Sequence, residues 1–472
     1  MINDLKPYPA MKDSGAPLLG EVPEHWEVRK LRQLLSRSTE RNRPDLPLLS
    51  VVRERGVILR DTTNNEGNHN YIPDDLSNYK VVRTGQFAMN KMKAWQGSYG
   101  ISRHEGIVSP AYFVFALEGI DGSFFNTAIR SRAYVPAFTQ ASDGVRVGQW
   151  DLSEARMREI AFVAPPPTEQ AAIVRFLDHA DRKIRRYIRA KQKLIKLLEE
   201  QKQAIIHRAV TRGLDPHVRL KASGVEWLGE IPGHWEVGSF SRIAVERADY
   251  RGATPEKTES GVFLITAKNV RKGWIDYEVS REYVAQKDYA KIMRRGMPKC
   301  DDLLLTMEAP LGHVALVDRE DIALAQRIVR FRFDASHVHP RFVLQSALST
   351  YFQNQLVSRG TGSTAMGIKA SKLPQLLLLL PPLSEQKEIL NWIDNACRPL
   401  DRIKARAEAE ITLLHEYVTR LIADVVTGKL DVREAATGLP ENLGYEQLEG
   451  SDYNKEDDDI ESTPELQEEY DT

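Results

Sequence analysis

Apolar residues recur at alternating steps of four and three along one stretch, from Thr168 to about Gly213, which contains no proline and only a terminal glycine. This spacing is typical of the apolar seam of a coiled coil. Thr168 follows three prolines and is a candidate N-cap, and Gly213 is a candidate helix stop. At about 1.5 Å per residue the predicted helix is roughly 70 Å long, too long for a core element of one small domain. Its predicted seam comprises Ile173, Leu177, Ala180, Ile184, Tyr187, Leu194, Leu198 and Ile205.

The same pattern occurs a second time, from Ser384 to about Gly428. Pro399 lies inside this stretch and predicts a kink near the first third of the second helix. Polar residues interrupt the two seams at Lys191 and Glu410, and we expect them to fix the register of one helix against the other. Adding 216 to the first seam gives the second, which comprises Ile389, Ile393, Ala396, Leu400, Ile403, Leu414 and Leu421.

A shorter repeated segment, here called the leader, lies upstream of each predicted helix. The leader SGAPLLGEVPEHWEV at 14–28 matches SGVEWLGEIPGHWEV at 223–237 at ten of fifteen positions, with an offset of 209. The match includes a His-Trp pair, in which the histidines are His25 and His234. Histidine can serve in metal and catalytic sites, but each of these stands alone beside a tryptophan and near a proline. We therefore expect both histidines to have a structural role at the entrance of a domain.

The region after each leader has mixed strand and loop character and ends in an apolar run and a proline pair that launch the following helix. Strands are predicted at 46–52, 111–117, 261–267, 302–307, 313–317 and 327–333. The sequence therefore predicts an α+β fold, in which two mixed α/β globular domains are separated by two long helices. We expect these helices to pack as an antiparallel coiled coil in a pseudo-twofold internal repeat. The expected boundaries are 1–164 and 214–380 for the domains, 165–213 and 381–430 for the helices, and 431–472 for a tail.

The net charge of −1 conceals a basic body and an acidic tail. Twelve of the 66 acidic residues but only one of the 65 basic residues lie between 446 and 472, so the rest of the chain carries 54 acidic and 64 basic residues. We expect the tail to be disordered and the body to bind a polyanion such as nucleic acid. An excess of this size can also arise by chance in a chain of this length.

Cysteine usage and hydropathy predict a cytoplasmic protein that does not bind a membrane. The two cysteines, Cys300 and Cys397, provide neither a disulfide framework nor a zinc site. No apolar run approaches the roughly 18 residues that a membrane span needs. The N-terminus lacks the basic and apolar regions of a signal peptide.

The sequence motifs of common enzymes are missing. We find no G-x-G-x-x-G after a strand, no phosphate-binding loop, no H-E-x-x-H, no Cys-x-x-Cys and no G-x-S-x-G. The Asn/Asp-Pro-Pro-aromatic motif of amino-methyltransferases is also absent. We therefore expect no catalytic residue, no metal site and no bound cofactor in this chain.

Basic and polar loops punctuated by glycine are the remaining candidates for function. Arg, Lys, Asn and Gln side chains can read base edges in the major groove, and hydroxyls can hold phosphates. Each such residue alone is more often solvated, but their presence in two repeated modules of a basic body favours DNA recognition. The candidate DNA-binding residues are Lys91, Lys93, Gln96, Tyr99, Arg103, Lys268, Asn269, Arg271, Arg359, Thr364 and Lys369.

The two helices have more than one possible partner. A heptad seam could pair this chain with a second copy of itself, but two copies of the seam within one chain can also satisfy each other. An antiparallel pair would relate the two domains by a pseudo-twofold axis, which is the symmetry of DNA half-sites on opposite strands. The helix length would then set the spacing between the half-sites.

The doubled motifs, in this order, resemble the specificity (S) subunits of type I restriction–modification systems over about residues 14–430. The resemblance is carried by LGEVPEHWEV with LGEIPGHWEV, by PPPTEQ with PPLSEQ and the helix after each, and by TAKNVRKGWID, DDLLLT and GSTAMGIKASKLPQL. It implies that each domain is a target recognition domain that reads one half of an asymmetric, two-part site in double-stranded DNA. It also implies that the helices dock two modification subunits, which carry S-adenosylmethionine and methylate adenine.

Restriction subunits, with ATP-driven translocation and Mg²⁺-dependent nuclease activity, would join that complex, and the S subunit itself would be non-catalytic. One alternative is the specificity subunit of a related complex in which cleavage and methylation share one partner chain. A second alternative is a coiled-coil scaffold whose globular modules bind proteins. The scaffold would show no sequence preference for DNA, which separates it from both other interpretations.

Overall fold

The computed structural model describes residues 5–60, 72–144, 150–225, 228–250, 255–362 and 366–440. These residues form two compact units. Within the described residues, the first unit comprises 5–191 with 409–440, and the second comprises 192–408. The candidate DNA-binding residue Thr364 and the acidic tail beyond 440 lie outside the described residues.

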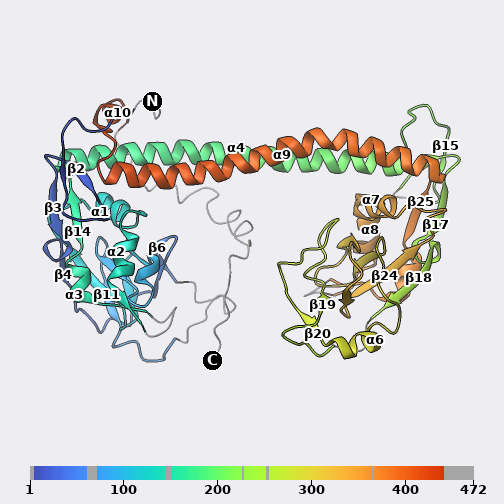
Figure 1. Ribbon diagram of the computed structural model, residues 1–472, viewed down its shortest axis with the longest axis horizontal. Coiled ribbons are helices and arrows are strands. Elements are labelled where there is room, and N and C mark those ends of the chain that lie inside the picture. Colours follow the sequence, from blue (N-terminus) through green and yellow to red (C-terminus); the bar gives the residue numbers. More distant parts are fainter. Residues whose placement is uncertain are drawn as a thin grey trace. The chain divides into compact units, whose positions relative to one another are not determined.

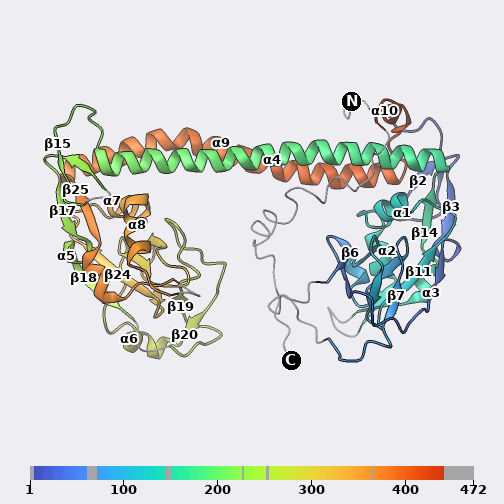
Figure 2. The same ribbon diagram turned by 180° about the vertical axis from the view of Figure 1, so that it is seen from behind.

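Two long helices are shared between the units, as the apolar periodicity predicted. Helix α4 runs over Pro167–Arg212 and helix α9 over Leu383–Val426. Within the first unit, the N-terminal half of α4 lies antiparallel to the C-terminal part of α9, and within the second unit the other halves pair in the same way (Figures 1 and 2). Helix α9 continues through Pro399, and the kink expected there stays a prediction.

The predicted seam largely coincides with the buried face of the helix pair. Its buried members are Ile173, Leu177, Ala180, Ile184, Leu198, Ile389, Ile393 and Leu421, and its half-buried members are Leu194, Ile205, Ala396, Leu400 and Leu414. In the first unit, Lys191 Nζ lies 2.6 Å from Glu410 Oε2, so the two polar seam residues form an ion pair across the helices. In the second unit, Lys202 Nζ lies 2.6 Å from Asp401 Oδ1.

Two predicted seam positions are wrong. Tyr187 is 54% exposed and Ile403 is 46% exposed. The buried residue near Tyr187 is instead Ile188, four residues after Ile184. A regular helix turns once per 3.6 residues, so a strict 3.5-residue spacing drifts off the buried face, and one step of four in place of three restores it.

The two units contain four-stranded antiparallel sheets with the same strand order. In the first unit the order is β4 (Leu35–Arg37), β11 (Phe113–Leu117), β8 (Phe87–Met89) and β9 (Tyr99–Ile101). In the second unit it is β18 (Ala244–Asp249), β24 (Ile328–Phe333), β21 (Leu303–Thr306) and β22 (Val314–Leu316). Four of these eight strands, β11, β21, β22 and β24, coincide with predicted apolar runs.

Each unit also contains smaller sheets of two or three strands. In the first unit these are β1 (Met11–Asp13) with β2 (Glu21–Pro23), β3 (Glu27–Lys30) with β14 (Ala161–Ala164), β5 (Leu49–Val52) with β6 (Gly56–Leu59), β7 (Lys80–Val82) with β10 (Gly106–Val108), and β12 (Ser142–Asp143) with β13 (Asp151–Leu152). In the second unit they are β15 (Leu220–Ala222) with β16 (Glu230–Pro232), β17 (Glu236–Ser239) with β25 (Leu377–Leu380), and β19 (Val262–Ile265) between β20 (Tyr283–Val284) and β23 (Ile322–Leu324).

Short helices complete the two cores. The first unit adds α1 (Gly122–Ile129), α2 (Val135–Gln140), α3 (Glu154–Arg158) and α10 (Arg433–Thr437), and the second adds α5 (Phe240–Ile243), α6 (Tyr289–Ile292), α7 (Pro340–Leu348) and α8 (Thr350–Arg359). Aromatic pairs join short helices to the sheets, as in the edge-to-face pair of Phe87 and Phe125 and that of Phe240 and Phe331. Among the described residues, no helix combines the length and apolar character that a membrane crossing needs.

Candidate nucleic-acid interface

The leader of each domain is fixed to the first turn of a long helix by one glutamate. In the first unit, Trp26 Nε1 donates to Glu169 Oε2 at 2.9 Å, and His25 Nε2 lies 2.8 Å from the same oxygen. Both tryptophans of the repeated leaders are fully buried. The glutamate sits where the unpaired amides of the helix start favour a negative charge.

The second unit repeats this arrangement. Trp235 Nε1 donates to Glu385 Oε1 at 3.0 Å, and His234 Nε2 lies 2.7 Å from Glu385 Oε2. The side chain of Glu385 is 23% exposed, whereas that of Glu169 is 4% exposed. Both histidines therefore have a structural role at the entrance of a domain, as expected from the sequence.

The glutamine that follows each glutamate ties the domain core to the same helix start. Gln170 accepts a hydrogen bond from Asp121 N and donates one to Pro165 O. Gln386 accepts from His339 N and donates to Pro381 O. The doubled Glu-Gln after the proline pair is thus explained by its contacts with the leader and with the residues that begin α1 and α7.

In each unit, the glycine that follows the end of the other long helix packs against the leader tryptophan. A Cβ atom at Gly428, after α9, would lie 3.1 Å from the Trp26 ring, and one at Gly213, after α4, would lie 3.3 Å from the Trp235 ring. Both glycines have positive φ, 75° and 71°, which glycine adopts without strain. Each unit therefore joins the start of one helix and the end of the other around a buried tryptophan.

In the first domain, most candidate DNA-binding residues gather at the β8–β9 turn. Lys91 pairs with Asp151 at 2.7 Å, Lys93 is exposed, and Gln96 is half-buried in a short 3₁₀ turn. Arg103 is exposed beyond the other end of β9. The structure therefore groups the first three residues on one turn and separates Arg103 from them along the strand.

The prediction that Tyr99 contacts DNA is wrong. Its side chain is fully buried in β9, its hydroxyl donates to Ile129 O at 3.2 Å, and its ring centroid lies 4.4 Å from that of Phe138. Burial raises the pKa of the Tyr99 hydroxyl. This tyrosine is a core residue that packs α1 and α2 against the sheet.

In the second domain, Lys268 and Arg271 lie in the segment that follows β19. Lys268 is exposed, and Arg271 is half-buried with Nε 3.3 Å from Asp276 Oδ2. The turn between β21 and β22 meets this segment, because His313 Nδ1 lies 2.8 Å from Val270 O. The β21–β22 turn corresponds in strand order to the β8–β9 turn of the first domain.

The prediction that Asn269 contacts DNA is also wrong. This side chain is fully buried, and Oδ1 accepts from Thr266 N at 2.8 Å while Nδ2 donates to Asp276 O and Ser280 O. Asn269 therefore closes the loop that carries Lys268 and Arg271. An amide is suited to this task because it donates and accepts at once.

The remaining candidates flank the same β21–β22 turn. Arg359, at the end of α8, is half-buried and donates through Nη1 to Gln355 O at 3.2 Å. Lys369 is exposed, and the residue before it, Ile368, donates its amide to Met307 O at 2.9 Å. Thr364 lies outside the described residues.

The sequence interpretation missed a cationic loop in the second domain. Five cations occur within the thirteen residues 287–299, which is a signal that charge counting alone can find. These cations are Lys287, Lys291, Arg294, Arg295 and Lys299, all exposed. In the part of the chain that the structure describes, no group of three or more His, Cys, Asp and Glu side chains is arranged to hold a metal ion.

Comparisons with known proteins point to one family. The model of the type I restriction modification DNA specificity domain matches residues 266–413. The type I restriction enzyme MjaVIII specificity subunit of Methanocaldococcus jannaschii is 27% identical over 58% of this chain, and the alignment spans 63% of that relative. The putative MjaX specificity subunit of the same organism is 21% identical over 88% of this chain and 96% of its own length.

A solved structure shares the fold. It was described in work on complex assembly and conformational transition of the type I R-M system, and it covers 87% of this chain and 99% of its own. The TM-score is 0.58 at 15% sequence identity. The shared architecture therefore extends over both units.

Proposed function

Because this chain belongs to the specificity (S) subunits of type I restriction–modification systems, we propose that it selects the DNA sequence on which a multisubunit complex acts. One observation carries the proposal. Each unit holds a four-stranded sheet of the same order, and each is fixed by the same His-Trp-Glu contact to the start of a long helix. Two equivalent modules in one chain suit a recognition site in two parts.

In this proposal residues 1–164 and 214–380 are the two target recognition domains, and each reads one half of an asymmetric site in double-stranded DNA. Residues 165–213 and 381–430 form an antiparallel coiled coil that relates the domains as an internal pseudo-twofold repeat. The ion pair of Lys191 with Glu410 and that of Lys202 with Asp401 support an antiparallel register. Half-sites on opposite strands have the same twofold relation, and the helices would set their spacing.

We assign the docking of two modification subunits to the outer faces of the helices. Apolar side chains are exposed there at positions related by the repeat: Tyr187 with Ile403, at 54% and 46%, and Leu197 with Leu413, at 51% and 62%. Exposed apolar side chains grouped on a surface commonly mark contacts with other proteins. A matching pair in each half of the chain fits two copies of one partner.

Catalysis belongs to the partners in this proposal. S-adenosylmethionine would be bound by the modification subunits, and ATP and Mg²⁺ by the restriction subunits. The absence of methyltransferase, phosphate-loop and metalloenzyme motifs from the sequence supports this division. The chain would contribute recognition and assembly alone.

The proposal is tested by exchanging one recognition domain. Residues 25–150 are replaced by those of another family member, and adenine methylation is mapped by single-molecule sequencing in cells that also express the modification partner. The matched control exchanges the second domain. We expect a two-part motif in which each exchange alters a different half. No motif, with the complex shown to be assembled, would instead favour a protein-binding scaffold.

A further inference from the structure

The second domain exposes a cationic loop, residues 287–299, between β20 and β21. Figure 1 shows α6, which lies within this loop, at the edge of the domain farthest from the helix pair. Lys287, Lys291 and Arg294 are exposed, and their side chains form no ion pair or hydrogen bond within the described ranges. Asp288 lies within the loop, Asp301 and Asp302 follow it, and Glu320 accepts a hydrogen bond from Cys300 N.

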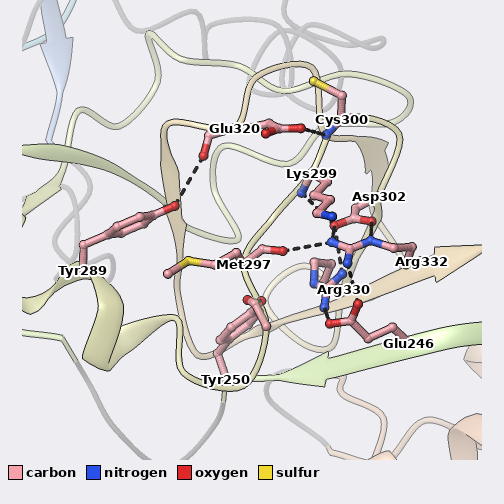
Figure 3. A network of polar contacts seen from close by, with 11 residues as sticks. Glu246, Tyr250, Tyr289, Met297, Lys299, Cys300, Asp302, Glu320, Arg330 and Arg332 are labelled. Atoms are coloured by element: carbon pink, nitrogen blue, oxygen red, sulfur yellow. Dashed lines mark hydrogen bonds and ion pairs between the residues drawn. The ribbon is translucent and has the colours of Figure 1, made fainter.

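An ionic network with a buried centre, the pair of Arg330 and Asp302, lies directly beneath this loop (Figure 3). Arg330 is fully buried, and its Nη1 donates to Asp302 Oδ2 at 2.9 Å while Nη2 donates to Glu246 Oε1. Arg332, two residues along β24, donates to both oxygens of Asp302 at 2.7 Å. Two guanidinium groups and two carboxylates therefore share one side of the β18–β24–β21 sheet.

The network holds the backbone of the loop at three successive points. Arg332 Nη2 donates to Met297 O at 2.9 Å, Tyr250 Oη donates to Gly296 O at 2.6 Å, and Lys299 N donates to Asp302 Oδ2 at 2.9 Å. These bonds leave the cationic side chains of the loop on the surface. The loop is thus fixed from below while its charges face outward.

Gly296 allows the loop to approach the network closely. Its φ is 147°, a conformation that favours glycine, and a Cβ atom there would lie 2.3 Å from Arg330 Nη2 and 2.8 Å from Glu246 Oε1. Buried ion pairs contribute little net stability, because desolvation offsets most of their attraction. A network of this kind is therefore better explained by the conformation that it imposes on the loop.

The first domain lacks this network at the corresponding sheet positions. Phe87 on β8 pairs with Phe115 on β11, and Leu303 on β21 pairs with Phe331 on β24. Aligning these two pairs makes Val114 the counterpart of Arg330 and Ala116 the counterpart of Arg332. Here an apolar cluster that includes Val114 takes the place of the ions. The nearby Arg83 is paired with Glu40 and Glu105. Among the described residues, the ionic network that fixes this loop is therefore found in the second domain and not at the corresponding sheet positions of the first.

We infer that residues 287–299 are a phosphate-binding surface for duplex DNA, an inference that rests on the proposed function and adds a backbone contact to the second domain. Lysine and arginine that project from a fixed loop suit the phosphates of a duplex, which are evenly charged along both strands. Contacts of this type position the protein on DNA and add affinity without reading sequence. The loop therefore strengthens binding to any duplex.

The test removes the three exposed cations together, as K287Q/K291Q/R294Q, in the full chain assembled with its modification partner. The matched control, K257Q/R281Q/R319Q, removes the same charge from cations of the same domain that are already paired with Glu282, Glu278 and Asp321. Binding is measured over a range of salt concentrations, both to a duplex that carries the wild-type methylation motif and to an unrelated duplex. Each phosphate contact contributes about 0.9 to the slope of log affinity against log salt concentration.

The expected result is a slope reduced by about 2.7 and an affinity for both duplexes about 100-fold lower near 0.15 M salt, with the methylation motif unchanged. The control variant retains most of the wild-type slope. The variant G296A, which changes no charge, should shift the loop and weaken binding to both duplexes without loss of a cation. Thermal unfolding of each variant shows whether the domain remains folded.

Three results overturn the inference. The first is a salt-dependence slope of the triple variant equal to that of the control, which would mean that the loop makes no phosphate contacts. The second is a change in one half of the methylation motif, which would make the loop a reader of bases. The third is weaker docking of the partner with an unchanged slope, which would make the loop a protein contact. Failure of the proposed function is distinct, because the wild-type complex itself would then yield no two-part methylation motif.

Discussion

Replacing Trp26 with phenylalanine removes one N–H donor and leaves most of the ring in place. In the wild-type chain this donor is bound to Glu169 Oε2 at 2.9 Å, and the Glu169 side chain is only 4% exposed. Water therefore has little access to replace the lost hydrogen bond. Hydrogen bonds to charged groups contribute about 1.5–3 kcal/mol, and we expect the Trp26→Phe variant to lose stability in this range.

The internal repeat supplies a matched comparison. Trp235 donates to Glu385, whose side chain is 23% exposed, so water can partly replace the bond and the Trp235→Phe variant should lose only about 0.5–1.5 kcal/mol. A negative control is Trp95→Phe, because Trp95 Nε1 is buried without a hydrogen-bond partner among the described residues. Removing a donor that has no partner should cost no hydrogen-bond energy.

Hydrogen exchange read by mass spectrometry is the suitable assay, because a chain with two compact units need not unfold in one two-state step. In the Trp26→Phe variant we expect protection in β3, β14 and the first turn of α4 to fall about 10- to 100-fold. The second unit should keep its protection. Equal losses for Trp26→Phe and Trp95→Phe would refute the reasoning, because ring size and not the N–H donor would then explain both.

Three further predictions concern the helix pair and pH. The Lys191→Glu variant should lower the stability of the first unit by about 0.2–1 kcal/mol, and adding Glu410→Lys should restore it. A double variant that is no more stable in thermal unfolding than the single variant would contradict the ion pair. Leu198→Glu places a charge on the buried face and should cost about 3 kcal/mol or more, whereas the neighbouring Leu197→Glu, at a residue 51% exposed, should be close to neutral; equal melting temperatures would contradict the assigned seam. Burial lowers the pKa of His207, His313 and His339 from the ordinary 6.5, so the unfolded state binds more protons than the folded state. The second unit should therefore lose stability as the pH falls through about 6.5 and below. Hydrogen-exchange rates corrected for intrinsic pH effects should show this loss, and the His313→Gln variant should reduce it.

Local features of the fold could be predicted from the sequence because they depend on spacing alone. The helices expected at 168–213 and 384–428 are observed at Pro167–Arg212 and Leu383–Val426. The apolar runs at 302–307 and 327–333 contain β21 and β24. Such elements can be predicted without knowledge of distant residues from the apolar periodicity, the prolines before the helix start and the glycine after the helix end.

The contacts between distant residues could not be predicted in the same way. The leader tryptophan and its glutamate are 143 residues apart in the first unit, and only their common repetition hinted at a link. Tyr99 and Asn269 show the limit for the candidate site, because a polar residue in a loop-rich stretch can turn inward and bond to backbone groups. The direction of a side chain depends on the strand pairing and loop closure around it, which composition does not reveal.

The central claim, that each recognition domain reads one half of a DNA site, is tested most directly by mapping adenine methylation for three chains. These are the wild type, a variant with Lys91, Lys93 and Arg103 changed to alanine, and a variant with Lys268 and Arg271 changed to alanine, each expressed with the modification partner. We expect a two-part motif in the wild type and relaxed selectivity in a different half for each variant. Loss of the same half in both variants, or an unchanged motif in both, would contradict the claim.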